Sequence, residues 1–221
     1  CGGCGKDLRD YKVVSPLDYS EPQSYTPKYL ADKILATRTA IEGERKNVSV
    51  LFADVADYTS LSEKLDAEEV QKILGGCFRI LIDEIYKYEG TIDKFTGDGL
   101  MALFGAPVSH EDHVQRACYA ALAMLKSLEA YGERIKNEFD MEFKMRMGLN
   151  TGPVIVGSVG NDLRMDYTAI GDTINLASRM QNTARPSTIL VTSEIYRNAR
   201  EFFKFSPLGK VKVKGKEIEL D

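Results

Sequence analysis

The chain has 221 residues, of which 43% are hydrophobic and 28% charged, and its formal net charge is −4 at pH 7. This composition is typical of a globular domain with a sizeable core and excludes a chain that stays disordered for lack of apolar residues. The acidic balance argues against a general nucleic-acid binder, whose surface is basic. No apolar run approaches the roughly 20 residues of a membrane span, and no secretory leader opens the chain, so we expect a cytoplasmic protein without a membrane span.

The first ten residues contain a cysteine pair, Cys1 and Cys4, in a C-x-x-C-G pattern typical of a zinc knuckle. Zinc takes four ligands and no second pair follows at ribbon spacing, so we expect residues 1–10 to be half of a zinc-ribbon-like knuckle. It would bind Zn²⁺ only with upstream ligands, in a longer protein with further regulatory domains. The alternative is a tail without function. Cys77 and Cys118 lie on apolar helical stripes and are expected to be buried, reduced thiols.

Residues 11–44 read as a linker followed by a helix. The stretch up to Gln23 is polar and contains Pro16 and Pro22. Thr26 and Pro27 then offer an N-cap and a proline at the first helical position, which predicts a helix to about residue 42. The catalytic domain is expected to occupy residues 45–221.

Hydrophobic periodicity predicts the elements of this domain. A capping box at Asp66 begins one long helix, which ends at Gly90, and an apolar stripe from Val114 marks a second. Strands are predicted at 48–55, 91–96, 100–104, 143–149, 154–159, 166–170 and 188–192 and around Val211 and Val213, with a further helix over 172–182. This order predicts an α+β fold, a ferredoxin-like palm in which a mostly antiparallel sheet carries helices on one face.

Two aspartates are expected to meet in this topology. The first strand and the central hairpin are neighbours in the sheet, so Asp54 near the strand end approaches Asp98 at the hairpin tip. Paired carboxylates of this kind can hold two Mg²⁺ or Mn²⁺ ions for displacement at phosphorus. Each residue alone has a simpler explanation, since Asp98 suits an Asp-Gly turn and Asp54 could cap a strand.

Three motifs, at residues 52–59 (FADVADYT), 94–99 (KFTGDG) and 167–179 (YTAIGDTINLASR), occur in one order. Together they resemble the catalytic domain of the class III nucleotidyl cyclases, the adenylate and guanylate cyclases, over about Lys46 to Gly215. The resemblance implies that the 3′-hydroxyl of a nucleoside triphosphate attacks its own α-phosphate. The products are a 3′,5′-cyclic nucleotide and pyrophosphate.

The resemblance also implies how metal and triphosphate are held. Asp54 and Asp98 match the two metal-binding aspartates, helped by the Val55 carbonyl. The substrate phosphates are assigned to the turn into the next helix and its backbone amides, at Val55, Ala56, Tyr58 and Thr59. The chain departs from the family at Asp57, where a glycine is usual. An acid there would repel phosphate unless its side chain turns away or caps the helix, so Asp57 is left outside the predicted site.

The third motif supplies two residues four apart on one helical face. By resemblance, Asn175 orients the ribose and Arg179 neutralises charge that builds on the α-phosphate in the transition state. For an isolated helix, a solvated polar face would be the simpler interpretation.

Lys94 and Thr168 match the purine-selecting pair of adenylate cyclases, whereas guanylate cyclases typically use Glu with Cys. Lysine donates to the N1 acceptor of adenine, so ATP is the expected substrate. A threonine in place of aspartate at position 168 is similar to the subgroup that includes the bicarbonate-responsive soluble cyclases, so the resemblance implies bicarbonate as an activator. Lys214 matches the lysine that reaches the terminal phosphate, although it could be a solvated lysine on an edge strand.

In the family the two metal aspartates come from one subunit, and the partner supplies the residues that match Lys94, Thr168, Asn175, Arg179 and Lys214. This chain carries both sets, which predicts a homodimer with composite active sites and an inactive monomer. Two other functions remain open: a pseudocyclase, which binds nucleotide and dimerises without turnover, and a guanylate cyclase. A diguanylate-cyclase-like palm would show a Gly-Gly-Asp/Glu hairpin, which residues 97–99 do not match.

Overall fold

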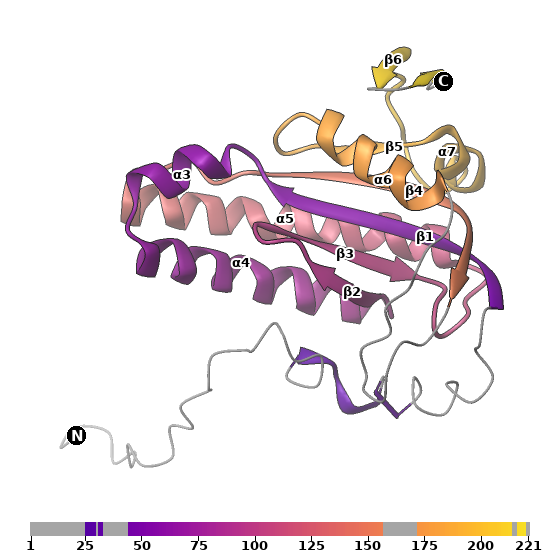
Figure 1. Ribbon diagram of the computed structural model, residues 1–221, viewed down its shortest axis with the longest axis horizontal. Coiled ribbons are helices and arrows are strands. Elements are labelled where there is room, and N and C mark those ends of the chain that lie inside the picture. The colour runs from indigo at the N-terminus through magenta and orange to yellow at the C-terminus, as the bar shows by residue number, and fades with distance from the viewer. Residues whose placement is uncertain (1–24, 30, 33–43, 157–171, 214–215, 220–221) are drawn as a thin grey trace.

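The computed structural model describes residues 25–29, 31–32, 44–156, 172–213 and 216–219. In chain order the elements are β1 (Glu44–Val55), α3 (Tyr58–Lys64), α4 (Ala67–Lys87), β2 (Thr91–Phe95), β3 (Gly99–Phe104), α5 (His113–Phe139), β4 (Met145–Val156), α6 (Asp172–Thr183), β5 (Ile189–Val191), α7 (Ser193–Ala199), β6 (Lys210–Val213) and β7 (Lys216–Glu219). The central sheet has the order β2-β3-β1-β4-β5, and β6 pairs with β7 in a separate hairpin (Figure 1). All pairs in the central sheet are antiparallel except β4 with β5, so the predicted α+β palm is confirmed.

Strand β4 differs from the prediction, which placed two strands around a break at residues 150–153. It is one strand that pairs with β1 along its whole length, with Pro153 opposite Asn47. The amide of Met147 points toward β5, since it donates to the Thr188 carbonyl at 3.0 Å. Pro153 is an even number of residues further along β4, so its backbone nitrogen points to the same side as that of Met147, but beyond the end of β5. No described strand offers an acceptor there, so the N–H that proline lacks removes no hydrogen bond from the sheet. The predicted break was therefore wrong.

The central sheet carries helices on both faces, so the predicted placement of helices on one face only was wrong in this respect. Met145 in β4 points toward α4, where the Cys77 sulfur lies 3.2 Å from its Sδ. Gly148, three residues along the strand and thus on the opposite face, lies against α6. Helices α4 and α5 therefore cover one face and α6 packs on the other (Figure 1).

The hydrophobic core lies between the sheet and the pair α4 and α5. Tyr131 of α5 donates to the Ile73 carbonyl of α4 at 2.7 Å, and a Cβ on Gly76 would overlap the Tyr131 hydroxyl. Cys77 and Cys118 are buried in this core, as predicted. Burial raises the pKa of both thiols, that of Cys118 to about 12, because a thiolate is poorly solvated in an apolar interior.

Helix α4 starts at the predicted capping box. Asp66 accepts from the Glu69 amide at 2.9 Å, and the Asp66 amide donates back to the Glu69 carboxylate at 3.2 Å. These two bonds satisfy two amides that a helix start leaves without partners. The local sequence thus determines where this helix begins.

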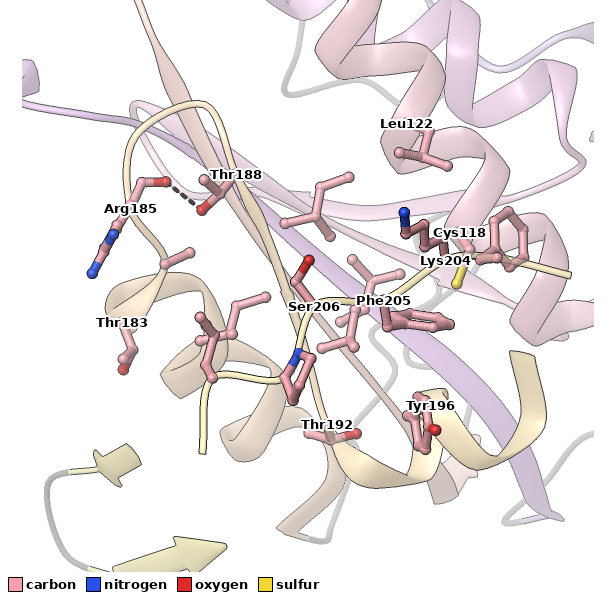
Figure 2. A pocket seen from close by; sticks show the side chains of 18 residues that line it. Cys118, Leu122, Thr183, Arg185, Thr188, Thr192, Tyr196, Lys204, Phe205 and Ser206 are labelled. Atoms are coloured by element: carbon pink, nitrogen blue, oxygen red, sulfur yellow. Dashed lines mark hydrogen bonds between the residues drawn. The ribbon is translucent and has the colours of Figure 1, made fainter. Parts of the chain in front are cut away.

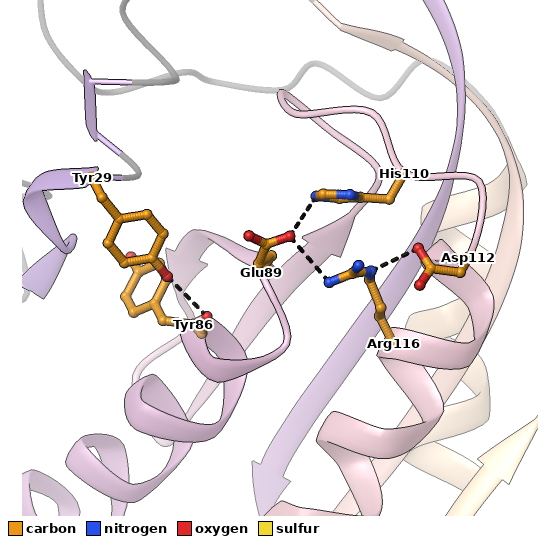
Figure 3. A network of polar contacts seen from close by, with 6 residues as sticks. All are labelled: Tyr29, Tyr86, Glu89, His110, Asp112 and Arg116. Carbon is orange, nitrogen blue, oxygen red and sulfur yellow. Dashed lines mark hydrogen bonds and ion pairs between the residues drawn. The ribbon is translucent and has the colours of Figure 1, made fainter.

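A polar network joins the end of α4 to the start of α5 (Figure 3). The Glu89 carboxylate lies 3.1 Å from the Arg116 guanidinium and 3.4 Å from His110, and Arg116 also binds Asp112 at 2.7 Å. Glu89 itself has φ 56, a left-handed conformation in the turn that leads into β2. The network holds this turn, which sets where the β2–β3 hairpin begins.

The predicted N-terminal helix lies mostly outside the described residues, as do Cys1 and Cys4. Within them, residues 28–29 and 31–32 are helical, and the Tyr29 hydroxyl donates to the Tyr86 carbonyl at 3.2 Å (Figure 3). Across the described part of the chain, no helix has the length and apolar character needed to cross a membrane.

Candidate active site

The structure brings Asp54 and Asp98 together at one end of the sheet. Asp54 lies opposite Gly99 in the β1–β3 register, and the Val55 amide donates to the Asp98 carbonyl at 3.2 Å. The hairpin closes through the Thr96 amide and the Gly99 carbonyl at 2.8 Å. Its two central residues are Gly97 and Asp98, with the positive φ of 91° at Gly97, and not the Asp-Gly pair that we expected. Asp98 is thus held at the tip, beside β1.

The two carboxylates influence each other electrostatically. Partial burial raises the pKa of Asp98, the negative charge of Asp54 raises it further, and the positive charge of Arg146 opposes the rise. Like charges this close disfavour double ionisation unless a cation lies between them. The pair is therefore suited to bind a metal ion.

Asp54 is oriented by two residues that the sequence analysis missed. Its Oδ2 accepts from Arg146 of β4 at 3.1 Å and from Gln181 of α6, also at 3.1 Å. Arg146 is the register partner of Asp54, a pairing that requires the alignment of β1 with β4. Gln181 lies on the buried face of α6, four residues after Ala177. This helical spacing from an apolar residue was the sequence signal for an inward-pointing side chain.

Asn175 and Arg179 lie on another face of α6. The buried residues of this helix are Thr173, Ala177, Met180 and Gln181. Arg179 is rotated by about 200° from Gln181, so it points away from the sheet that carries Asp54. Within the described residues the Arg179 Nη1 is buried and has no hydrogen-bond partner. One copy of the chain thus does not bring Arg179 to its own aspartates.

Lys94 of β2 is on the aspartate side of the sheet. Lys94 lies opposite Met101 of β3, and Met101 lies opposite Phe52 of β1, so the three side chains share one face of the sheet. Asp54 is two residues after Phe52 and therefore lies on that face too. The Lys94 side chain is 59% exposed and its Nζ lies 3.9 Å from Asp93. Thr168 and Lys214, the other predicted substrate-binding residues, lie outside the described residues.

The turn from β1 into α3 differs from the prediction at two amides. The Val55 N–H donates to the Asp98 carbonyl at 3.2 Å, so it is already bound within the sheet. The Ala56 N–H donates to the Lys144 carbonyl at 2.9 Å, which extends the sheet and removes this amide from the predicted phosphate contacts. The amides of Tyr58 and Thr59 remain, since the first turn of a helix has no acceptors for them. Asp57 has φ 57 and its side chain makes no capping bond. A glycine would adopt this conformation without strain, which explains the family preference noted above.

The donor set fits a hard divalent cation. Asp54, Asp98 and the Val55 carbonyl supply oxygen ligands, and Mg²⁺ characteristically takes one or two carboxylates and completes its shell with water and substrate phosphates. No group of three or more His, Cys, Asp or Glu residues gathers in the described segments, so a closed all-protein metal site is not formed there. The substrate would supply the missing ligands.

A separate cavity of about 740 Å³ lies beside β5 (Figure 2). Residues of α5, β5, α7 and the segment 203–208 line it, among them Leu122, Tyr196 and Phe205, and none of its lining residues is acidic. It contains none of the predicted site residues. The cavity is therefore distinct from the aspartate pair.

The raised pKa of Asp98 predicts a pH-dependent stability effect. A raised folded-state pKa means that ionised Asp98 destabilises the metal-free fold above that pKa and does so no longer below its ordinary value of 3.8. Asp98→Asn should therefore raise the thermal midpoint at pH 7 without metal, and the gain should shrink as the pH falls toward 3.8. Calorimetry measures both. Asp83→Asn, at an exposed position of α4, is the control, and a lower midpoint for Asp98→Asn at pH 7 would contradict the electrostatic argument.

The chain is similar to known proteins over most of its length. A family model described as the adenylate and guanylate cyclase catalytic domain matches residues 41–220. Adenylate cyclase 1 of Rhizobium meliloti is 37% identical over 179 residues, 80% of this chain and 27% of that protein. Guanylate cyclase soluble subunit beta-2 of Homo sapiens is 30% identical over 196 residues, 86% of this chain and 30% of that protein. The chain thus spans less than a third of either relative.

Solved structures share the fold. The adenylyl cyclase CyaB from P. aeruginosa superposes with a TM-score of 0.75 and 34% identity, covering 81% of this chain and 94% of that one. The guanylyl cyclase Cya2 superposes with a TM-score of 0.72 and 32% identity, covering 81% and 91%. Similar structures therefore include enzymes named for either purine nucleotide.

Proposed function

Because this chain belongs to the adenylate and guanylate cyclase catalytic domain family, we propose that it converts ATP to 3′,5′-cyclic AMP and pyrophosphate in sites shared by two copies. The observation that carries the proposal is the orientation of α6. Asp54 and Asp98 lie on the side reached by Gln181, while Asn175 and Arg179 of the same helix point elsewhere. A second copy must then supply Asn175 and Arg179 to these aspartates.

Each group has a role in the cyclisation. Asp54, Asp98 and the Val55 carbonyl would hold two Mg²⁺ or Mn²⁺ ions, which when bound polarise the α-phosphate and lower the pKa of the 3′-hydroxyl. Arg146 lies beside the carboxylate pair, and its Nε is buried without a partner among the described residues. A buried donor of this kind favours an anionic ligand, so Arg146 joins Tyr58 and Thr59 as a candidate contact of the triphosphate.

The partner copy would complete the reaction geometry. Asn175 would orient the ribose, and Arg179 would neutralise the charge that develops on the α-phosphate. The buried Arg179 Nη1, which has no partner in the described part of one chain, supports this role because buried donors are normally satisfied. Lys214 would reach the terminal phosphate, and both Lys214 and Thr168 remain predictions from the sequence.

ATP is proposed as the substrate because Lys94, which matches the purine-selecting lysine, stands exposed and so could reach a nucleotide bound at the aspartates of a second copy. A lysine donates to adenine N1, whereas guanine presents a donor at that position and would leave the lysine mismatched. Bicarbonate as an activator follows from Thr168 alone.

An assay with purified dimer tests the proposal. With Mg²⁺ or Mn²⁺, cyclic AMP from ATP should form at least about 10-fold faster than cyclic GMP from GTP at equal concentrations, since one mismatched polar contact is worth about one order of magnitude or more. Lys94→Glu should lower this ratio by removing the donor to N1, and chromatography of both cyclic products measures it. Lys87→Glu, an exposed lysine of α4, is the control.

Three outcomes would overturn parts of the proposal. A preference for GTP would identify a guanylate cyclase. Binding of ATP without either product would identify a pseudocyclase. Activity unchanged by bicarbonate at fixed pH would remove bicarbonate as an activator.

A further inference from the structure

Helix α6 carries two functional faces, and one of them has no assigned role. Asn175 and Arg179 form the face proposed above to act on substrate. On the opposite face Gln181 is 5% exposed and donates through Nε2 to Asp54 Oδ2 at 3.1 Å. A buried amide that binds a carboxylate is a polar contact with a definite geometry, not a packing contact.

The bond from Gln181 orients the Asp54 carboxylate. Arg146 donates to the same oxygen at 3.1 Å, so both donors lie on Oδ2. Oδ1 is directed toward the hairpin, where it would lie 3.0 Å from a Cβ on Gly99. The two donors thus turn the other oxygen toward the side that carries Asp98.

Helix α6 is also fixed rigidly to the sheet. A Cβ on Gly148 would lie 2.5 Å from the Ala177 carbonyl oxygen and would overlap the Gln181 backbone. At the helix start, the Asn150 side-chain Nδ2 donates to the Thr173 carbonyl at 2.9 Å, and the Thr173 hydroxyl donates to the Pro153 carbonyl at 2.9 Å. The helix therefore has little freedom to move independently of β4.

We propose that Gln181 is a positioning residue that orients Asp54 for metal binding in the protomer's own site. Since Gln181 and Arg179 belong to one rigid helix, α6 would serve its own site through Gln181 and the neighbouring site of a dimer through Arg179. The first part concerns one chain alone. The second part rests on the proposed shared-site function.

The first test is a metal titration without nucleotide. Gln181→Met keeps the side-chain length and removes the donor, so Mn²⁺ measured by calorimetry or electron paramagnetic resonance should bind about 10-fold more weakly, as is usual when a residue that orients a metal ligand is lost. Gln71→Met, the same change at an exposed position of α4, should leave the Mn²⁺ affinity unchanged. Unchanged Mn²⁺ affinity in folded Gln181→Met would overturn the proposal. If that variant melts below the assay temperature, Gln181→Asn is used instead. Its side chain is one methylene shorter, so its amide stays polar but does not reach Asp54.

The second test uses heterodimers of Asp54→Ala with Arg179→Ala chains, which contain one complete site. Gln181→Met placed in the Arg179→Ala chain, which supplies Asp54, should raise the Mg²⁺ concentration for half-maximal activity about 10-fold. The same change in the Asp54→Ala chain should leave that concentration unchanged. Equal effects in both placements would show a general structural role and overturn the positioning role. If no cyclic product forms in wild type, the proposed function fails while the Mn²⁺ titration still decides the role of Gln181.

Discussion

Mixing Asp54→Ala chains with Arg179→Ala chains should restore activity that neither variant has alone. The two substitutions remove opposite halves of each composite site, so either homodimer has two broken sites. In a mixed dimer, one site combines Asp54 of one chain with Arg179 of the other and is intact. Random pairing makes half of the dimers mixed, and each mixed dimer has one intact site of two. The mixture should therefore recover about a quarter of wild-type activity.

The magnitude makes this experiment decisive. Removing one group that stabilises transition-state charge costs about 10²–10³ in rate, so the single variants should lie far below the recovered activity. Mixing Asp54→Ala with Asp98→Ala is the matched control, because both residues belong to the same half and no mixed dimer has an intact site. Product is quantified in the exchanged mixture and again in heterodimers isolated with two affinity tags, which should have about half of wild-type activity because each has one intact site of two. Absence of recovery in isolated heterodimers would refute the shared site.

Gly148→Ala should nearly abolish activity while leaving much of the fold intact. The added methyl would stand 2.5 Å from the Ala177 carbonyl and overlap the Gln181 backbone, which no side-chain rotation relieves. Helix α6 must then move off β4, at a cost of about 1–3 kcal/mol for an overpacked contact. Displacement of about 1 Å at a reacting group can cost about 100-fold in rate. The turnover number should therefore fall at least that far, since Asn175, Arg179 and Gln181 all move.

Gly152→Ala is the control for this prediction. Gly152 lies on the same face of β4, but the three atoms nearest to its added Cβ all belong to the Thr173 side chain, the hydroxyl oxygen at 2.9 Å. That side chain can adjust, so activity should fall much less. Thermal midpoints and turnover are measured for both variants. Comparable activity losses in the two would show that the close approach at Gly148 has no special importance.

Much of the fold was predictable because it depends on local patterns. The capping box at Asp66 started α4, and the apolar stripes placed Cys77 and Cys118 in the core. The strand order then placed Asp54 beside the hairpin that carries Asp98. The break predicted at residues 150–153 was wrong. Pro153 has no N–H to donate, but its nitrogen lies where no described strand has an acceptor, so the strand continues through it. Local turn propensity could not reveal which side of β4 was unpaired.

The sequence by itself determined the family, the carboxylate pair and the candidate residues on α6, since these follow from residue type, order and helical spacing. Only the tertiary structure showed that Arg146 and Gln181 converge on one oxygen of Asp54, because these residues are 92 and 127 positions away from it along the chain. Only the structure showed the Ala56 amide bound to Lys144, and the close approach at Gly148. Such contacts depend on strand register and helix placement. These are set by packing between distant segments, so no local pattern encodes them.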